Sequence, residues 1–483
     1  MPKKSPERRF FGIMYENTTM KEEEIKFLAE EYKKAPELFR RENFIDSPEF
    51  LETLGICLPE ADSLPKGCLK LHPQDFIVEE IPVSEKIQTV YLGDFFDQKN
   101  IGQTGKTFNS TLIKCGILTF QAVEEISSFL KIDKEKIKYS GLKDEDAITS
   151  QHISITTSSA ENLKDFKSPN FFLKDSSFSD KFVGMGYLKG NKFTILVRTD
   201  GSFNAEKFEE NLKNVQENGF YNFFYSQRFS SPRFVNWFWG LLILKGDYRN
   251  AVLSYLCTEG QRELPYFKNL RQEFKENFGN WEKIKEIIAP ISSFMPTELR
   301  IINYLLEHPS DFAGALNAVS EQIQLWISAY GSLLFNRKIS ECILNNESLP
   351  ETLPLILSED KNDWIEYFEF LKEDGITALP TKNLKPFKNI VLKKRKVKTR
   401  QNVQIHKVKI IPEGVVASFS LPKGCYATTF LAHLFLLNAD GFELLQGISD
   451  KIIDVKEVLG EKPIRDVMER FKEVLQRKKE SLW

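Results

Sequence analysis

A short loop in the first third of the chain carries residues that could act on a substrate. The stretch from Tyr139 to Gln151 reads YSGLKDEDAITSQ and places Lys143 directly before Asp144. A neighbouring ammonium group favours the ionised form of a carboxylate, and a carboxylate acts as a nucleophile in that form. Asp144 is therefore a candidate nucleophile, in a loop of the kind on which sites are commonly built. The structural alternative is that Asp144 or Thr149 is a turn or cap residue.

The same loop contains three consecutive acids, Asp144, Glu145 and Asp146. Carboxylate oxygens bind magnesium well, so a metal-dependent nuclease or phosphodiesterase is a second class of function for this chain. Consecutive acids in one loop rarely converge on one ion, and no distant acidic motif accompanies them. The six cysteines form no C-x-x-C pair, and no histidine stands at zinc-ligand spacing from them. We therefore expect no metal site, and reduced thiols as in cytosolic proteins.

The elements that position this loop belong to a chain of 483 residues, a length that suggests roughly two to four domains. Hydrophobic residues make up 41% and charged residues 28%, which is typical of a globular protein with a sizeable core. The formal net charge of −2 excludes a generally basic protein, so nucleic acid would have to bind at a local cluster. No apolar run approaches the ~20 residues that span a membrane, and the basic amino terminus lacks a signal-peptide core. We expect a cytoplasmic protein without a membrane partner.

Strand patterns occupy both flanks of the chain, and helical spacing dominates the region between them. Residues 187–198 predict a turn at Gly190-Asn191 followed by an alternating strand, and residues 205–218 predict a helix packed on a sheet. The highly charged first 65 residues predict one or two solvated helices. Further strands are predicted at 68–82, 152–158, 402–411 and 415–422, and further helices at 121–131 and around 326–334.

Strands, then helices, then strands again indicate a mixed α/β or α+β catalytic domain that is interrupted by an inserted domain. Residues 87–110 also look inserted. The expected divisions are an amino-terminal extension (1–65), the first part of the catalytic domain (66–229), the inserted domain (230–385), the second part of the catalytic domain (386–440) and a carboxy-terminal helical tail (441–483).

The loop resembles the G-x-K-D-x-x-A-x-T-x-Q motif of TruD-type pseudouridine synthases, with matches at Gly141, Lys143, Asp144, Ala147, Thr149 and Gln151. Six further segments, in the family's order, are similar to its other motifs. They are PQDFIVEE (73–80), LIKCGILT (112–119), LKGNKF (188–193), NFFYSQRF (222–229), AYGSLLFNR (329–337) and SFSLPKGCYATTFL (418–431).

This resemblance implies an α+β fold, in which a pseudouridine synthase domain with a mixed, mostly antiparallel sheet is interrupted by an inserted helix-rich TRUD domain. It implies conversion of uridine to pseudouridine in RNA, with uridine 13 of tRNA as the family's expected target. Asp144 would be the nucleophile that assists glycosidic bond cleavage, by attack or by proton abstraction at the sugar. The reaction changes no redox state and loses no group, so no cofactor is expected.

The resemblance also assigns roles outside Asp144. Phe224 would form a wall for the flipped base, and Asn222 would position the loop or the base edge. Lys143 would be an ion partner of the site or a phosphate contact, and Glu80 would orient another polar group. The alternative for Phe224 is an ordinary core aromatic, in a chain with 40 phenylalanines.

Three positions depart from the family pattern. Gln74 replaces the usual glutamate, and Tyr225 and Ser230 stand where the family usually has glycine. Because glycine serves where positive φ or close backbone approach is required, these changes affect the loop geometry. They leave a third class of function, a non-catalytic RNA-binding protein with the same fold.

Binding RNA requires positive charge. The run LKKRKVKTR, residues 392–400, has six basic residues and no acidic one. We predict that Lys393, Lys394, Arg395 and Lys396 contact RNA, with a solvated strand face as the alternative. The expected partner is RNA, tRNA first, and the chain is expected to be a monomer.

Overall fold

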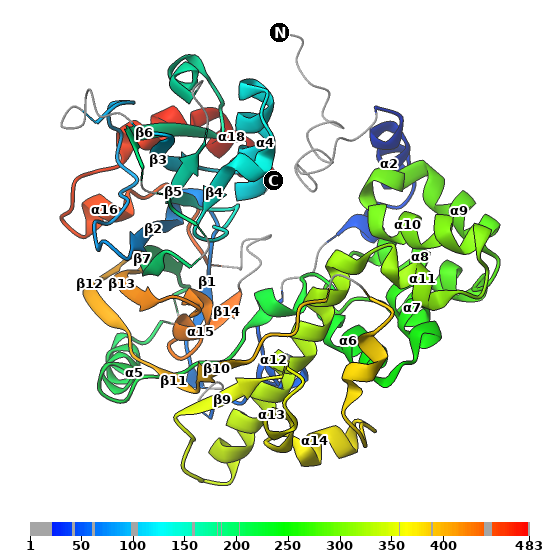
Figure 1. Ribbon diagram of the computed structural model, residues 1–483. Coiled ribbons are helices and arrows are strands. Elements are labelled where there is room, and N and C mark those ends of the chain that lie inside the picture. Colours follow the sequence, from blue (N-terminus) through cyan, green and yellow to red (C-terminus); the bar gives the residue numbers. More distant parts are fainter. Residues whose placement is uncertain are drawn as a thin grey trace. The chain divides into compact units, whose positions relative to one another are not determined.

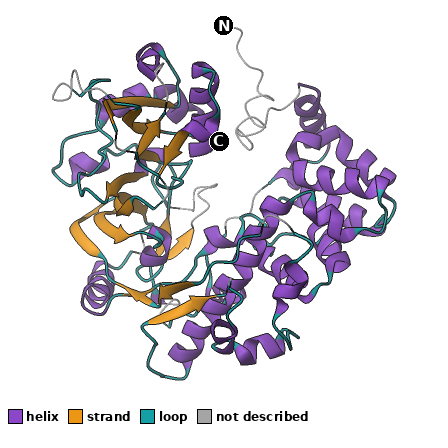
Figure 2. Cartoon of the chain, in the orientation of Figure 1, coloured by secondary structure: helices purple, strands orange, loops and turns teal. Residues whose placement is uncertain are grey.

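The computed structural model forms two compact units, whose helices and strands are drawn in Figures 1 and 2. The sheet unit contains the described residues of 63–220 and 402–483, and the helical unit contains those of 1–62 and 221–401. The helical unit therefore begins before and ends after the inserted domain expected at 230–385. The structure describes residues 22–40, 44–59, 63–97, 105–156, 160–180, 182–184, 186–201, 203–356, 358–387, 390–438 and 447–481.

Within the described residues, the sheet unit is built on a ten-stranded sheet of order β12-β13-β7-β2-β5-β3-β6, to which β1, β14 and β4 add. β2 runs parallel to β5, and β1 parallel to β14, whereas the other pairs are antiparallel. The predicted α+β fold with a mixed, mostly antiparallel sheet is confirmed. The strands are β1 (Lys66–Cys68), β2 (Phe76–Pro82), β3 (Thr107–Lys114), β4 (Ile137–Tyr139), β5 (Ile148–Ile155), β6 (Phe171–Ser179), β7 (Leu188–Arg198), β12 (Gln404–Ile411), β13 (Gly414–Pro422) and β14 (Leu436–Asn438).

Helices cover both faces of this sheet. On β3, Leu112 packs in one hydrophobic cluster with Ile126 of α4, and its neighbour Ile113 packs in another with Val467 and Phe471 near the carboxyl end. Successive side chains of a strand point to opposite faces, so the carboxy-terminal helices complete the core opposite α4. The helices of this unit are α4 (Thr119–Leu130), α5 (Ala205–Asn218), α15 (Ala427–Leu431), α16 (Val455–Val458), α17 (Arg465–Arg470) and α18 (Lys472–Ser481).

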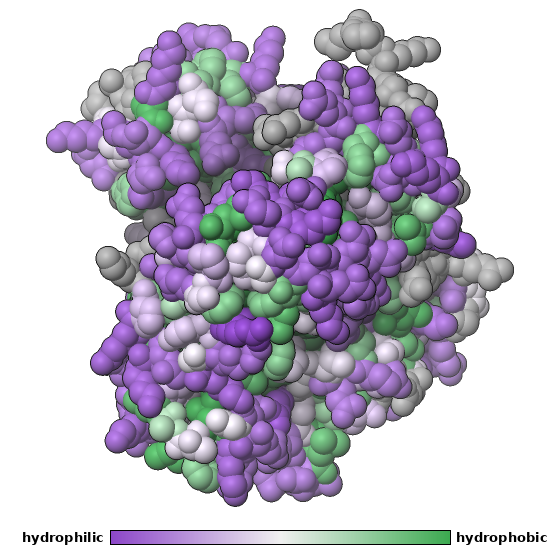
Figure 3. All heavy atoms as spheres, turned by 90° about the vertical axis from the view of Figure 1, so that its right-hand side faces the viewer, coloured by the Kyte–Doolittle hydropathy of each residue, from purple (hydrophilic) through white to green (hydrophobic). Residues whose placement is uncertain are grey.

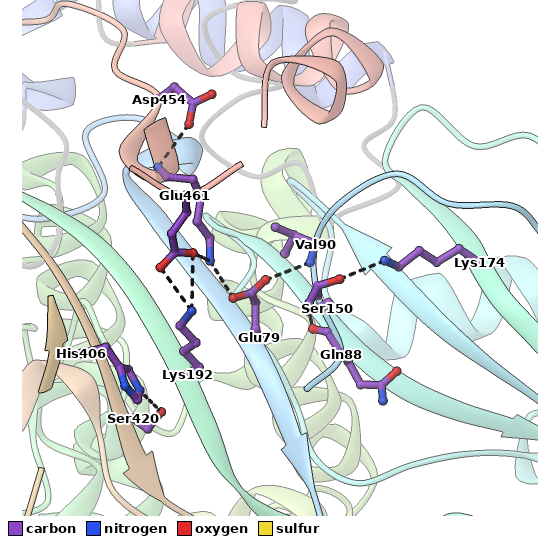
Figure 4. A network of polar contacts seen from close by, with 12 residues as sticks. Glu79, Gln88, Val90, Ser150, Lys174, Lys192, His406, Ser420, Asp454 and Glu461 are labelled. Atoms are coloured by element: carbon purple, nitrogen blue, oxygen red, sulfur yellow. Dashed lines mark hydrogen bonds and ion pairs between the residues drawn. The ribbon is translucent and has the colours of Figure 1, made fainter. Parts of the chain in front are cut away.

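A buried network of ion pairs joins the carboxy-terminal segment to the sheet (Figure 4). The Lys456 Nζ of α16 donates to Glu79 Oε2 of β2 at 2.7 Å and to Glu461 Oε2 at 3.1 Å. Lys192 of β7 also contacts Glu461, at 3.4 Å. Burial lowers the pKa of Lys456, but the attraction of Glu79 outweighs burial and raises it above its ordinary value. The lysine is therefore charged, and its charge is compensated within the core.

A second buried pair fixes the chain that leads into α16. Arg198, at the end of β7, donates to both carboxylate oxygens of Asp75, at 2.7 and 2.8 Å, and neither side chain is exposed. The same guanidinium donates to the carbonyl oxygens of Ser449 and Lys451. Four donated hydrogen bonds satisfy a charge that would otherwise be costly to bury.

β7 is one continuous strand, so the turn predicted at Gly190-Asn191 is wrong. Both residues lie between two partner strands, and Asn191 pairs with Glu80 of β2 and with Leu421 of β13. A Cβ atom on Gly190 would lie 2.3 Å from the Leu421 carbonyl oxygen. Glycine serves here for close approach between strands, a requirement that the local sequence does not distinguish from a turn.

The other helices of the helical unit pack around one long helix, α12, which is buried along most of its length. α6 packs closely against it, because a Cβ on Gly240 would lie 2.2 Å from the Trp326 carbonyl oxygen. The helix-rich insertion expected from the sequence is observed. The helices of this unit after residue 221 are α6 (Asn236–Lys245), α7 (Tyr248–Cys257), α8 (Pro265–Glu276), α9 (Trp281–Ile288), α10 (Pro296–Glu307), α11 (Phe312–Asn317), α12 (Ser320–Leu344), α13 (Lys361–Ile365) and α14 (Phe368–Glu373). β9 (Thr352–Leu355) pairs with β10 (Arg395–Lys398), and β8 (Phe220–Tyr221), which begins with the last residue of the 63–220 part of the sheet unit, pairs with β11 (Arg400–Gln401).

The amino-terminal helices, α2 (Glu22–Lys34) and α3 (Pro48–Thr53), belong to the helical unit. α2 was expected to be solvated, but it buries Ile25 and Leu28. Its Glu24 is buried too, and the carboxylate accepts hydrogen bonds from Ser292 Oγ at 2.9 Å and from the backbone of Ser293 at 3.0 Å. The expectation therefore holds for one side of this helix only.

Hydrophilic side chains predominate on the face of the molecule drawn in Figure 3, with smaller hydrophobic areas between them. No described helix combines the length and the apolar character that a membrane crossing requires.

Candidate active site

Residues 140–147, the Asp144 loop, connect β4 to β5 in the sheet unit. Lys143 N donates to Thr119 Oγ1 at 3.1 Å, and Thr119 Oγ1 donates in turn to Gln151 Oε1 at 3.0 Å. Gln151 Nε2 then donates to Gly141 O at 3.1 Å. Thr119 and Gln151 are fully buried, so this chain of hydrogen bonds sets the loop conformation from inside the unit.

The carboxylate of Asp144 remains accessible on this fixed loop. Its side chain keeps 38% of its surface exposed, and Oδ1 accepts a hydrogen bond from Lys70 Nζ at 2.5 Å. Burial raises the pKa of Asp144, but the attraction and hydrogen bond of Lys70, with the attraction of Lys114, outweigh burial and hold the pKa below its ordinary value. The carboxylate is therefore ionised at neutral pH and within reach of a ligand.

Lys70 pairs with Asp144, and sequence reasoning missed this candidate site residue. It lies between β1 and β2, 74 positions before Asp144, with a backbone φ of +56°. Its ammonium group also lies 4.5 Å from the centroid of the Phe76 ring, a contact that favours a cation. A single lysine belongs to no spacing pattern that would mark it as functional. The signal in this region was the PQDFIVEE segment that follows it, which resembles a family motif.

Lys143 is engaged elsewhere, although it precedes Asp144 in the sequence. Its Nζ lies 3.0 Å from Glu80 Oε2 and donates to Asn191 Oδ1 at 2.9 Å, and its side chain is 3% exposed. Glu80 Oε1 also accepts hydrogen bonds from Ser140 Oγ and from His152 N. The structure thus brings Lys143 and Glu80 together as a buried pair that joins the loop to β2. The cation that pairs with Asp144 comes from Lys70 instead.

Lys114, the last residue of β3, lies beside the loop backbone. Its side chain is fully buried, and Nζ donates to the carbonyl oxygen of Asp144 and, at 2.8 Å, to that of Ile117. Burial lowers the pKa of Lys114 to about 8, against the attraction of Asp144. Sequence reasoning matched this lysine to a family motif but gave it no role.

Phe224 and Asn222 belong to the helical unit. Phe224 is buried and packs edge-on against Phe335 of α12, and its backbone N and O both bond to the side chain of Asn336. The Asn222 side chain donates to Lys398 O at 2.9 Å. Both residues are thus firmly positioned, with Asn222 tying its segment to the end of β10.

The described residues contain no group of three or more His, Cys, Asp or Glu side chains arranged to hold a metal ion. Asp144, Glu145 and Asp146 are therefore not such a group.

A family model described as tRNA pseudouridine synthase D (TruD) matches residues 63–355, which include the Asp144 loop and Lys114. The chain belongs to the TruD family. Members of this family are pseudouridine synthases, so the chain is an enzyme of the isomerase class.

The sequence of this chain aligns with relatives of the same family name over most of their length. Probable tRNA pseudouridine synthase D 2 of Methanocaldococcus jannaschii is 29% identical over 408 residues, which cover 76% of this chain and 91% of the relative. Probable tRNA pseudouridine synthase D of Methanosarcina barkeri is 31% identical over 313 residues, which cover 62% and 67%. The crystal structure of the putative tRNA pseudouridine synthase D from Methanosarcina mazei matches with a TM-score of 0.60 at 24% identity, and covers 81% of this chain and 98% of that chain. The fold is therefore that of the TruD structure.

The two positions where TruD proteins usually have glycine are accommodated differently. Tyr225 has an extended backbone, with φ −88° and ψ −176°, so it does not need the freedom of glycine. Its buried hydroxyl donates to Asp46 Oδ2 at 2.8 Å. Ser230 adopts the left-handed conformation itself, with φ +59°, and its Oγ accepts a hydrogen bond from Asn236. A side-chain contact therefore accompanies each departure from the family pattern.

The predicted RNA patch is exposed at Lys393, Lys394, Arg395 and Lys396. Strand β10 carries the last two of these and pairs with β9, while Val397 anchors it by burial. Lys394 is paired with Asp360 at 2.5 Å, which raises its pKa above the ordinary value. Part of the patch is therefore neutralised locally, and its contact with RNA stays a prediction.

Proposed function

We propose that this enzyme converts uridine to pseudouridine in tRNA, at uridine 13, with Asp144 as the nucleophile. Membership of the TruD family and the names of the relatives support tRNA as the substrate. The observation that carries the role of Asp144 is its carboxylate, which is ionised, partly exposed and paired with Lys70 on a loop held by buried hydrogen bonds.

The reaction breaks the bond between N1 of uracil and C1′ of the ribose, and it forms a bond between C5 and C1′. Attack of the Asp144 carboxylate on C1′ releases the base with the bonding electron pair on N1. The base then turns, C5 displaces the carboxylate from C1′, C5 loses its proton and N1 gains one. Atoms and electrons balance without a co-reactant. Proton abstraction at the sugar by the same carboxylate is the alternative route.

Lys70 supports both the attack of Asp144 on C1′ and the later displacement of its carboxylate by C5. Its ammonium group keeps Asp144 ionised before the attack, and it stabilises the carboxylate again when C5 displaces it. Lys143 and Glu80 hold the loop to β2 and, on this proposal, do not touch the substrate. This division of roles differs from the sequence expectation, in which Lys143 was the ion partner of the site or a phosphate contact.

The target base must leave its stack, which costs a few kcal/mol, and the enzyme must supply replacement contacts. Phe224 as the wall for this base and Asn222 as a positioning residue remain predictions. Phe224 is held at its backbone by Asn336, so Phe224→Leu should keep the fold of its segment while removing the ring. Slower turnover per folded molecule, beyond the loss of stability expected when a buried ring is shortened, would support the role of this ring.

The experiment that tests the proposal maps pseudouridine in tRNA after incubation with purified wild-type protein and with Asp144→Asn, both in EDTA. New pseudouridine from the wild-type protein alone would identify the reaction, the essential carboxylate and the position of the target. Loss of wild-type activity in EDTA would favour the nuclease-type metal chemistry instead. Binding of tRNA without product from either protein would favour the non-catalytic alternative.

A further inference from the structure

Lys114 lies beside Asp144, but the proposed reaction assigns it no role. Its side chain is fully buried, and among the residues that the structure describes its Nζ donates to two backbone carbonyl oxygens, those of Asp144 and Ile117. Burying an ammonium group is costly, and an apolar side chain could fill a similar volume. The lysine therefore needs a reason beyond packing.

The contacts around Lys114 supply that reason. Lys143 N donates to Thr119 Oγ1, the Asp144 carbonyl accepts from Lys114 Nζ, and Gly116 N donates to the Glu145 carbonyl at 3.1 Å. Three consecutive residues of the loop are thus held through their backbone by one segment, residues 114–119. The middle contact, at the carbonyl oxygen of Asp144, comes from the ammonium group of Lys114. Hydrogen bonds from charged donors are stronger than those from neutral donors.

We propose that Lys114 is a positioning residue, whose buried ammonium group fixes the backbone of Asp144 and thereby aims the carboxylate at the substrate. This inference rests on the proposed role of Asp144 and deepens it. Lys114 does not touch the substrate and moves no proton in the reaction. A carboxylate that shifts by about 1 Å loses on the order of 100-fold in rate, so a single lost grip at this point matters.

The charge of Lys114 depends on the groups that face it. Asp144 and Glu145 on the loop and Cys115 beside it favour the ammonium form, whereas burial and the nearby charge of Lys70 disfavour it. With a pKa of about 8, the group is mostly charged at pH 7 and mostly neutral at pH 9. Above this pKa the grip on Asp144 loses its charge, and the carboxylate loses the attraction of a second cation.

The test compares Lys114→Met with Lys174→Met, a matched control. Lys174 is also buried in the sheet unit with a pKa lowered by burial, and its Nζ contacts Thr89 and Asp175 rather than the loop. In single-turnover assays we expect Lys114→Met to lower the rate of pseudouridine formation by about 100-fold, with tRNA affinity unchanged. Lys174→Met should keep the wild-type rate per folded molecule. Equal rates for Lys114→Met and the wild type would overturn the proposal.

A pH profile separates positioning from simple loss of structure. The wild-type rate should fall as pH rises above about 8. Lys114→Arg should show a lower plateau without this fall, because arginine stays charged. Any decline caused by the RNA bases is common to both proteins and cancels in their ratio. A constant ratio between pH 7 and 10 would refute the inference, even if Lys114→Met failed to fold.

A readout without catalysis keeps this inference distinct from the proposed function. Carboxyl ¹³C titration of Asp144 should give a higher pKa in Lys114→Met than in the wild type, because the attraction of Lys114 is removed. An inactive wild-type protein would refute the proposed function and leave this titration intact. An active wild-type protein with the same Asp144 pKa and the same rate in both forms would refute the role of Lys114 alone.

Discussion

Two lysine–carboxylate pairs of the sheet unit, Lys70–Asp144 and Lys456–Glu79, use the same groups in different surroundings. Their N–O distances are similar, 2.5 and 2.7 Å. Asp144 keeps 38% of its side-chain surface exposed, whereas Glu79 keeps 2% and also accepts from Val90 N at 3.1 Å. Exposure, rather than distance, thus separates a pair that can meet a substrate from one that joins a helix to a sheet. Substitutions in the two pairs should accordingly affect different measurements.

The largest effect is expected at the open pair. Asp144→Asn should lower the single-turnover rate by about 10⁴-fold or more and leave the unfolding temperature nearly unchanged, because this side chain is partly solvated. Glu145→Gln, at the neighbouring acid, should retain the wild-type rate. Pseudouridine formation and thermal unfolding measured on the same samples check both statements. A rate for Asp144→Asn within tenfold of wild type would remove this residue from the chemistry.

The buried pair should respond in the opposite way. Glu79→Gln leaves Lys456 with one carboxylate partner, Glu461, in the core, so we expect the free energy of unfolding to fall by about 3 kcal/mol. Its turnover per folded molecule should match the wild type. Denaturant unfolding measures the first quantity and an active-site-normalised assay the second. A stable but inactive Glu79→Gln protein would contradict this division between the two pairs.

A smaller effect is expected from the cation of the open pair. Lys70→Met should raise the pKa of Asp144, which still stays ionised at neutral pH. The rate there should fall by about tenfold, because the variant loses about 1.4 kcal/mol of stabilisation of the carboxylate as C5 displaces it. Lys192→Met is the matched control, because the Lys192 side chain is as exposed as that of Lys70, at 17%, and is paired with Glu461. Comparable rate losses in both variants would mean that general charge, and not pairing with Asp144, is responsible.

The acid side of the pH profile gives the smallest change. The folded pKa of Asp144 lies below its ordinary value of 3.8, so ionisation stabilises the fold above that value and this contribution is lost as pH falls below it. The rate should therefore stay constant between about pH 5 and 7. Stopped-time assays in matched ionic strength would check this. A rate that falls with a midpoint near pH 6 would indicate that another group controls the acid limb.

On the alkaline side, the stability contributed by Lys114 and the reaction rate are expected to change in opposite directions. Because burial lowers the pKa of Lys114 to about 8, the unfolded chain binds more protons than the folded one between that pH and the ordinary 10.5. The contribution of Lys114 to stability therefore rises with pH while its grip on Asp144 weakens. Thermal unfolding followed with the rate should separate the two trends, and a rate that only tracks unfolding would count against the assignment.

The Asp144 loop could be predicted because its residues match a motif. The residues that contact the loop could not be predicted, because they lie far from it in the sequence. Asp144 was singled out because six loop residues match a family pattern at fixed spacing. Local patterns indicated β2, β5, β7, β12 and β13, whereas β3 and β6 were not predicted. The pairing of Asp144 with Lys70 spans 74 positions and leaves no trace in spacing. The same limit applies to the pairing of Lys143 with Glu80, and to the wrongly predicted turn at Gly190-Asn191, where β2 and β13 impose a strand.

The amino-acid composition also did not predict that a charged segment would be partly buried. The charged stretch that forms α2 buries Glu24 along with Ile25 and Leu28, because two serines beyond α9 supply hydrogen bonds to the carboxylate. Acid-rich segments usually read as solvated. A partner 268 positions away, at Ser292, decided otherwise.

The buried Lys456–Glu79 contact has a consequence for how the chain is made. Its two residues are separated by 377 positions, so at about 5–20 residues per second the ribosome needs roughly 20–75 s to deliver the second after the first. During that time β2 has been synthesised, but the helices that cover its face have not. The sheet must therefore wait for the segment around Lys456 before its core closes, and residues 221–401 of the helical unit are synthesised within that interval.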